Sequence, residues 1–236
     1  MLSRRQILSG WGTTALVAAM PGVVLAAAIK PDETSALLVI DVQNCFLPGG
    51  SLAVTGGDEI IIPINRLGRR FDNVVMTQDW HPAGHISFAS SHIGLKPFEV
   101  IGLPYGPQVL WPDHCVWDTH GAQFSKDIEL PHSQMTIRKG YHDVIDSYSG
   151  FEEADRKTKT GLEGYLRERG LKRLFIAGLA TDFCVSWTAL DARAAGFETY
   201  VIEDACRGID TGGSMAQAWA DMNAAGVNRI VAGDIV

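Results

Sequence analysis

The fold is decided by residues 173–185, Arg173-Leu174-Phe175-Ile176-Ala177-Gly178-Leu179-Ala180-Thr181-Asp182-Phe183-Cys184-Val185. The first half of this stretch is short and apolar, which is typical of a strand buried on both faces. Across residues 183–195 the apolar positions instead follow a helical spacing, and Asp182 is a candidate cap of that helix. Cys184 therefore stands where a buried strand turns into a helix.

A cysteine at the start of a helix has a special electrostatic environment. Unpaired backbone N–H groups and the positive end of the helix dipole lower the pKa of a thiol, and the N–H groups bind an oxyanion. The alternative is a buried structural cysteine, which is the commoner role of a lone cysteine. Cys184 is thus either a nucleophile or a packing residue, and the rest of the chain must distinguish the two.

Strand-like and helix-like segments alternate along the chain. This alternation predicts a single α/β domain over residues 35–236, a doubly wound, six-stranded, mainly parallel sheet with helices on both faces. The irregular span 79–130 is rich in Pro, Gly and His, which favours functional loops. The predicted strands are residues 36–40, 74–76, 135–137, 174–176, 199–202 and 229–231, and the predicted helices are residues 58–70, 161–169, 183–195 and 213–225.

Composition excludes some partners. The 236 residues carry a formal net charge of −7 and no basic block, which argues against nucleic acid. A small neutral or cationic ligand is easier to admit. The sequence leaves room for a homo-oligomer.

The first 28 residues differ from the rest. Arg4-Arg5 precedes a weakly apolar stretch that ends in Ala26-Ala27-Ala28, the layout of a signal peptide. The order around the arginines resembles the twin-arginine export signal, which predicts a periplasmic protein without a stable membrane anchor after cleavage near Ala28. An uncleaved anchor is the alternative. Residues 29–34 are then a short linker.

Export makes the four cysteines, Cys45, Cys115, Cys184 and Cys206, candidates for disulfides. Their irregular spacing does not resemble a disulfide scaffold. We expect Cys184 to be a free thiol.

Polar residues follow several of the predicted strands. Asp41 follows the first strand, Asp79 the second, Lys139 the third and Cys184 the fourth. In a parallel sheet the carboxyl ends of the strands form the ligand site. We therefore expect these four residues to converge on one crevice, where Asp41 and Lys139 could serve a nucleophilic Cys184.

A second set of residues has the chemistry of metal ligands. Asp79-Trp80-His81-Pro82 places a carboxylate beside an imidazole, with His85 further on and His114 in the stretch Trp111-Pro112-Asp113-His114-Cys115. Such ligands suit zinc, iron or manganese and leave positions for water. The other histidines have no comparable partners, and we interpret them as structural: His92, His120, His132 and His142.

Taken together, these motifs resemble the nicotinamidase family of isochorismatase-like cysteine hydrolases from about Ser35 to the C-terminus. The stretches that carry the resemblance are Asp41-Val42-Gln43-Asn44, Gly49-Gly50-Ser51-Leu52-Ala53-Val54, Asp79-Trp80-His81-Pro82, Trp111-Pro112-Asp113-His114-Cys115, Lys139-Gly140, Asp146-Ser147-Tyr148-Ser149 and Gly178 to Val185. Their order along the chain makes the match more specific than any single motif. Cys45 departs from the family, which commonly has aspartate there.

The resemblance implies hydrolysis of nicotinamide, and of its analogue pyrazinamide, through a thioester on Cys184. Asp41 would be the proton shuttle, Lys139 would hold Asp41 and the thiolate in register, and the N–H groups of Ala180 and Cys184 would form the oxyanion hole. A cis peptide would join Leu179 to Ala180.

The resemblance also assigns a metal site and a pocket. One divalent metal, zinc first and iron or manganese as alternatives, would be held by Asp79, His81 and His114 and would bind the pyridine nitrogen of the substrate. His85 would ligate directly or through water. Aromatic walls around the ring would come from Phe46, Trp111 and Tyr148.

Three alternatives stay open on the sequence alone. The first is a sister enzyme of the same superfamily that acts on isochorismate or on another aromatic or carbamoyl amide. The second is a metallohydrolase in which Cys184 is incidental. The third is an exported protein that binds pyridines without turning them over.

Overall fold

The computed structural model of the chain describes residues 28–236. All but the last residue of the predicted signal peptide therefore lies outside the described residues. Within residues 28–236, no helix combines the length and the apolar character that crossing a bilayer requires.

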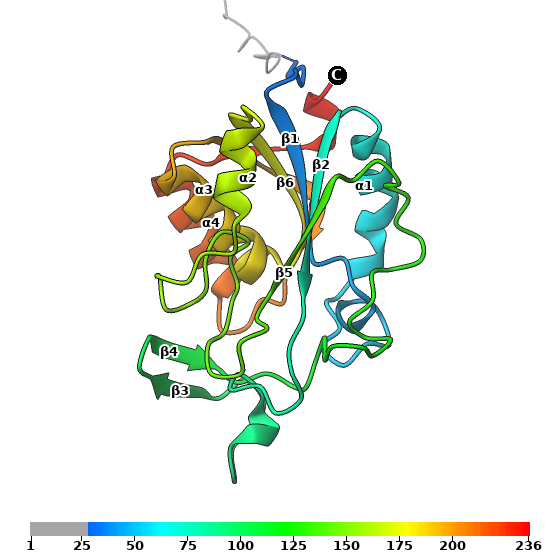
Figure 1. Cartoon of the computed structure of the whole chain (residues 1–236). Helices are drawn as coiled ribbons and strands as arrows, with labels where there is room; N and C mark the ends of the chain where they lie inside the picture. The colour runs from blue at the N-terminus through cyan, green and yellow to red at the C-terminus, as the bar shows by residue number, and fades with distance from the viewer. Residues whose placement is uncertain (1–27) are drawn as a thin grey trace, which may run out of the picture.

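Six parallel strands form the central sheet, in the order β5-β2-β1-β6-β7-β8 (Figure 1). The chain starts near the middle, winds outward through β2 to β5, and then winds the other way from β6 to β8. The predicted doubly wound, six-stranded sheet is confirmed. The bounds are Ser35–Ile40 for β1, Asn73–Asp79 for β2, Met135–Lys139 for β5, Arg173–Leu179 for β6, Glu198–Arg207 for β7 and Asn228–Ile230 for β8.

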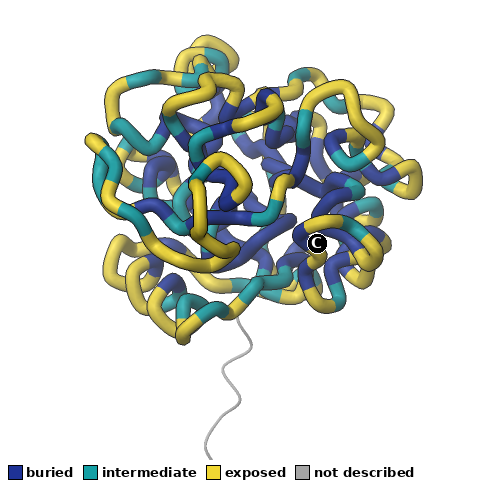
Figure 2. Tube along the Cα trace, turned by 90° about the horizontal axis from the view of Figure 1, so that it is seen from below, coloured by how far each residue is buried: buried dark blue, intermediate teal, exposed yellow. Residues whose placement is uncertain are grey.

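Helices cover both faces of the sheet (Figure 1). Helix α1, Ile61–Gly68, lies on one face, and α2, Leu162–Glu168, α3, Ser186–Ala194, and α4, Ser214–Ala224, lie on the other. Alternate residues of β1 point to opposite faces, as in any strand. Leu37 and Val39 accordingly pack in the core under α1, and Leu38 packs in the core under the other three helices. Figure 2 shows this buried interior surrounded by exposed loops.

The span that the sequence left irregular contains a small hairpin. Strands β3, Val100–Leu103, and β4, Gly106–Val109, pair antiparallel and form a two-stranded sheet of their own. Figure 1 places this hairpin beyond the end of the central sheet at which β2 and β5 finish. The long span after β2 therefore builds over the carboxyl edge of the sheet, where a ligand site is expected.

The segment after β6 differs from the prediction in its first turn. A π-helical turn, Thr181–Val185, precedes α3, and the side chain of Asp182 does not cap it. The Asp182 carboxylate instead accepts hydrogen bonds from the backbone N–H groups of Ile209 and Asp210. The prediction of Asp182 as the helix cap was wrong, because donors in a neighbouring loop occupy its oxygens.

Candidate active site

The carboxyl edge of the sheet brings together four of the polar residues that the sequence singled out. Asp41 follows β1, Asp79 and Lys139 are paired at the ends of β2 and β5, and Cys184 lies in the turn after β6. All four side chains are buried. Residues that are up to 143 positions apart in the chain therefore share one site, because their strands end at one edge.

Lys139 is the centre of this cluster. Its Nζ lies 2.9 Å from Asp41 Oδ2 and also contacts Asp79 Oδ1. The same ammonium donates to the carbonyl oxygen of Ser147 at 3.0 Å and to Cys184 Sγ at 3.2 Å. Burial lowers the pKa of an ammonium, but Asp41 and Asp79 outweigh burial and hold the pKa of Lys139 well above its usual value. Lys139 is therefore a fixed positive charge between two carboxylates and a thiol.

Asp41 has one oxygen that is held and one that is available. The Thr77 hydroxyl donates to Asp41 Oδ1 at 2.6 Å. Oδ2 lies beside Lys139 without hydrogen-bond alignment and accepts no hydrogen bond from the described residues. A carboxylate oxygen of Asp41 lies within 4.8 Å of Cys184 Sγ. Burial raises the pKa of Asp41 above its ordinary value. The site thus places an available base beside the thiol.

The pKa of the Cys184 thiol is raised, which corrects the prediction of a lowered pKa. Burial raises the pKa of Cys184 well above its usual value, and Asp41 and Asp79 raise it further, so the opposing effect of Lys139 is overcome. The start of a helix lowers the pKa of a thiol, but burial and the two carboxylates act in the opposite direction at Cys184. A reactive thiolate here requires that the proton move to a neighbouring base when the substrate arrives.

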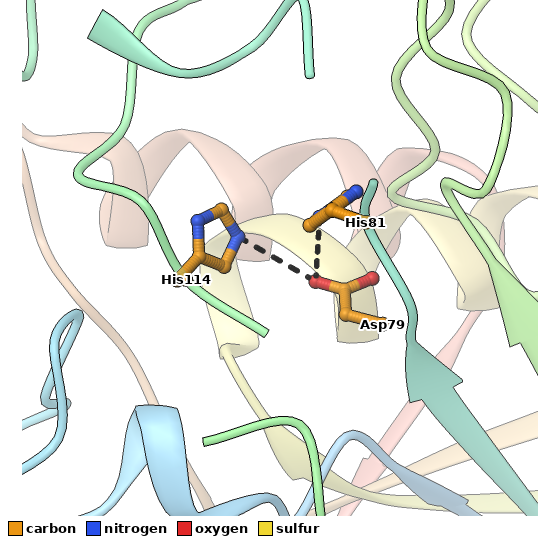
Figure 3. A group of neighbouring side chains, drawn as sticks. All are labelled: Asp79, His81 and His114. Carbon is orange, nitrogen blue, oxygen red and sulfur yellow. Dashed lines mark ion pairs between the residues drawn. The ribbon is translucent and has the colours of Figure 1, made fainter. Parts of the chain in front are cut away.

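The predicted metal ligands converge beside this cluster (Figure 3). The Nε2 atoms of His81 and His114 lie 3.6 and 3.7 Å from Asp79 Oδ2. Each imidazole is oriented by its other nitrogen, since Nδ1 of His81 bonds the carbonyl of Gly140 at 2.8 Å and Nδ1 of His114 bonds that of Pro112 at 2.9 Å. Both Nε2 atoms therefore lie beside one carboxylate oxygen, and two imidazoles with a carboxylate are donors that fit a divalent cation.

His85 lies next to this set but differs from it in its hydrogen bonds. Its ring is tilted by 31° from that of His81, with centroids 4.3 Å apart. Its Nδ1 bonds the Ser87 hydroxyl at 2.7 Å and its Nε2 bonds the carbonyl of Ile145 at 3.2 Å. Burial, with the neighbouring His81, lowers the pKa of His85 to about 4. Both ring nitrogens of His85 are therefore engaged, whereas His81 and His114 each keep one free of carbonyl and hydroxyl partners.

The remaining histidines lie among other polar groups. His92 bonds the carbonyl of Ile86, His132 that of Gly68, and His142 pairs with Glu153. The His120 ring lies within hydrogen-bond distance of the Asn44 side chain.

A small cavity is lined both by Cys184 and by two of the predicted metal ligands, Asp79 and His114. Its walls include three rings that the sequence predicted, and Trp111 meets Tyr148 edge-on with centroids 6.4 Å apart. Flat aromatic faces of this kind suit a flat ring. The lining consists of Phe46, Leu52, Asp79, Trp111, His114, Asp146, Tyr148, Ala180, Phe183, Cys184 and Ile209.

Four lining residues were not assigned a role from the sequence: Leu52, Asp146, Phe183 and Ile209. Leu52, Asp146 and Phe183 lie inside the quoted motifs, so proximity to those motifs was an available signal. Ile209 lies in the loop after β7, outside every quoted motif. Gln108, in β4, was also missed: it supports the cavity wall by donating to Asp146 Oδ2 at 2.7 Å and to the Tyr148 hydroxyl at 3.0 Å.

The backbone before the thiol has the expected form. The peptide bond between Leu179 and Ala180 is cis. The N–H of Ala180 donates no hydrogen bond to any residue in the range 28–236. An N–H group in this position at the cavity wall is available to an anionic oxygen.

One disulfide joins two loops that carry site residues. Cys45, next to Phe46, is bonded to Cys115, next to His114. Among residues 28–236, Cys184 and Cys206 are free and buried. The spacing of the cysteines gave no sign of the Cys45–Cys115 pair, because the contact spans 70 residues and depends on the fold.

Comparison with known proteins gives a consistent result. The isochorismatase domain model matches residues 35–232. The nicotinamidase of Acinetobacter baylyi is 58% identical over 208 residues, which are 88% of this chain and 97% of that protein.

Two solved structures are also similar. The Acinetobacter baumanii nicotinamidase pyrazinamidase superposes with a TM-score of 0.86 at 58% identity, over 87% of this chain and 99% of the other. The pyrazinamidase of Pyrococcus horikoshii in complex with zinc has a TM-score of 0.69 at 37% identity, over 84% of this chain and 99% of the other.

Proposed function

Because this chain belongs to the isochorismatase family, we propose that it is a cysteine hydrolase that converts nicotinamide to nicotinate and ammonia and also accepts pyrazinamide. One observation carries the proposal: Cys184 Sγ lies 3.2 Å from Lys139 Nζ, beside Asp41, at the wall of an aromatic cavity that also contains Asp79 and His114. The likeness to the Acinetobacter baylyi nicotinamidase supports the choice of substrate.

The first half of the reaction forms a thioester. Asp41 takes the proton of Cys184 as the sulfur attacks the carboxamide carbon, which gives a tetrahedral intermediate. The N–H groups of Ala180 and Cys184 stabilise its anionic oxygen. Asp41 then gives the proton to the departing nitrogen, the C–N bond breaks, and ammonia leaves.

The second half uses the same groups. Asp41 takes a proton from water, whose oxygen attacks the thioester carbon. The C–S bond then breaks, Asp41 returns its proton to the sulfur of Cys184, and the nicotinic acid that forms releases the other proton of the water to solvent to give nicotinate. Lys139 stays protonated throughout, because its two carboxylate neighbours hold its pKa well above the usual value. Its positive charge stabilises both the thiolate and the carboxylate of Asp41.

The residues Asp79, His81 and His114 fit a divalent metal ion, because a carboxylate oxygen and one nitrogen of each imidazole lie within 4.8 Å of one another. When bound, such an ion fixes the pyridine nitrogen of the substrate and orients the carboxamide toward Cys184. The zinc complex of the related pyrazinamidase supports zinc as the ion, and iron and manganese suit the same donors.

The aromatic walls explain the preference for a flat ring. Phe46, Trp111 and Tyr148 line the cavity, and Trp111 Nε1 donates to the Tyr148 hydroxyl at 3.1 Å, which fixes both side chains. A planar amide between fixed rings loses little further freedom before attack.

We also propose that the protein works in the periplasm after export through the twin-arginine route. The support is the Arg4-Arg5 pair ahead of the apolar stretch. Replacing both arginines with lysine should retain the protein in the cytoplasm, as measured by cell fractionation. Unchanged periplasmic activity would count against this route.

The test of the activity is ammonia release from nicotinamide, pyrazinamide and benzamide by the mature protein, with nicotinate followed by chromatography. We expect release from the first two, and a rate at least ~10-fold lower from benzamide, which lacks the ring nitrogen. Absence of ammonia from nicotinamide would overturn the proposal.

A further inference from the structure

The loop between β7 and α4, residues 208–213, forms one wall of the substrate cavity through Ile209. This loop is rich in glycine, and Gly212 and Gly213 both have positive φ, at +61° and +85°. A segment of this kind has many backbone conformations available to it. Its position at the cavity therefore requires a restraint from outside the loop.

Asp182 provides that restraint. Its Oδ1 accepts the N–H of Ile209 at 3.0 Å, and its Oδ2 accepts the N–H of Asp210 at 2.8 Å together with the hydroxyl of Ser214. Asp182 is 6% exposed as a residue, so these hydrogen bonds lie in a buried environment. The approach of the loop to Asp182 is close, because a Cβ built at Gly208 would lie 3.0 Å from Asp182 Oδ1.

Asp182 also belongs to the turn that carries the nucleophile. The π-helical turn Thr181–Val185 contains both Asp182 and Cys184. One carboxylate therefore joins the thiol turn to the loop that presents Ile209. Asp182 therefore links the position of this wall to the turn that carries the sulfur.

We propose that Asp182 is a positioning residue that sets the width of the substrate cavity by holding Ile209 at a fixed distance from Cys184. The inference rests on the proposed function, since it takes the cavity to be the site of a flat aromatic amide. It assigns Ile209 as a residue that determines which ring substituents are admitted. Asp182 does not touch the reacting atoms and takes no proton in the reaction.

The test is Asp182→Asn, which keeps the size of the side chain but replaces one acceptor oxygen with a donor. We expect KM for nicotinamide to rise about tenfold and kcat to change less than about twofold. The wall contacts the substrate equally in the ground state and in the transition state, so loss of these contacts weakens binding without slowing the chemical step. The ratio of kcat/KM for 5-methylnicotinamide to that for nicotinamide should rise. Hydrogen exchange at the amides of Ile209 and Asp210 should accelerate at least tenfold.

A matched control is Asp221→Asn on α4, where an exposed carboxylate contacts only the Gln217 side chain among the described residues. This variant should leave KM and amide exchange unchanged. Ser214→Ala removes one of the three donors to Asp182. It should raise KM and accelerate amide exchange, each by less than Asp182→Asn does. If Asp182→Asn does not fold, Ser214→Ala is the test.

A fall in kcat at constant KM, or unchanged exchange at Ile209 and Asp210, would overturn the proposal. If the native protein releases no ammonia from nicotinamide, the proposed function fails, while the exchange measurement still decides the role of Asp182.

Discussion

The two clusters that share Asp79 balance their charges in different ways. In the nucleophile cluster, the ammonium of Lys139 lies against Asp41, Asp79 and the sulfur of Cys184, so the chain itself supplies the positive charge. In the ligand cluster, the Nε2 atoms of His81 and His114 lie 3.6 and 3.7 Å from Oδ2 of Asp79, so the partners are two imidazoles.

Asp79 is the point at which the two clusters meet. Burial alone raises the pKa of its carboxyl, but Lys139 and His81 together lower that pKa well below its usual value. Burial lowers the pKa of His81, and Asp79 more than reverses this, so the ligand cluster favours a positive charge. The nucleophile cluster thus contains its own ammonium group, whereas the ligand cluster offers one carboxylate oxygen and two imidazole nitrogens that could hold a metal ion.

The largest effect is expected from Cys184→Ala. Removal of the sulfur should lower kcat/KM for nicotinamide by at least ~10³-fold, because no other group can form the covalent intermediate. The metal content, measured by plasma mass spectrometry, should not change, since the ligand cluster is untouched. Cys206→Ala is the matched control, because Cys206 is the other free, buried thiol of the described residues and lies in β7 outside the cavity. Activity of the Cys184→Ala variant above a tenth of the native value would favour a metal-activated water as the nucleophile.

Asp41→Asn should lower kcat/KM by roughly 10²–10⁴-fold, the range for loss of a general acid and base. In the native protein burial raises the pKa of Asp41, so its carboxyl stays protonated to a higher pH than an ordinary aspartate. Activity needs the carboxylate and should therefore fall as the pH drops through this raised pKa.

The pH profile of kcat/KM checks this expectation, with its limbs assigned to Asp41 and Cys184 as a pair. Asp41→Glu keeps a carboxylate, so it should be more active than Asp41→Asn, and its pH profile should still fall at low pH. An acid limb that persists unchanged in the residual activity of Asp41→Asn would assign it to another group.

Disruption of the ligand cluster should lower kcat/KM by less than the two preceding variants do, and the size of the loss should depend on the substrate. His114→Ala, or treatment with a chelator, should lower kcat/KM for nicotinamide by about 10–100-fold and leave the slow reaction with benzamide nearly unchanged. His132→Ala is the matched control, because its imidazole bonds the carbonyl of Gly68 on the α1 side of the sheet. Equal losses with nicotinamide and benzamide would mean that the ion acts on the carboxamide and not on the ring nitrogen.

The parts of the site that could be predicted from the sequence lie at strand ends. Asp41, Asp79 and Lys139 each follow or end an apolar run, and parallel pairing then requires them to meet. The Cys184 turn was recognisable for the same reason. Such positions follow from the order of strands alone.

The parts that could not be predicted depend on contacts made by irregular segments. The disulfide of Cys45 and Cys115 and the loop around Ile209 arise only when distant loops meet over the sheet. The direction of the Cys184 pKa shift was missed because it depends first on the burial of the thiol and then on two nearby carboxylates, and no local pattern encodes either. Gln108 belongs to the same class, since it lies in a hairpin within the span that looked irregular.

The smallest effect is expected at Gln108, which supports the ligand side of the cavity without touching the thiol. Its buried amide donates to Asp146 Oδ2 and the Tyr148 hydroxyl and so fixes an aromatic wall. Gln108→Leu keeps the volume and removes both hydrogen bonds. We expect KM for nicotinamide to rise about 3–10-fold with kcat nearly constant, because each bond contributes about 1 kcal/mol to the position of the wall.

Two further variants make this expectation decisive. Gln134→Leu removes a similar amide whose Nε2 donates to the carbonyl of Asp72, away from the cavity, and should leave KM unchanged. Gln108→Glu places a second carboxylate against Asp146 and should raise KM more than Gln108→Leu does, because the two like charges are buried together. If Gln108→Leu instead lowers kcat and leaves KM unchanged, the hairpin acts on the nucleophile cluster, and the two clusters are not independent.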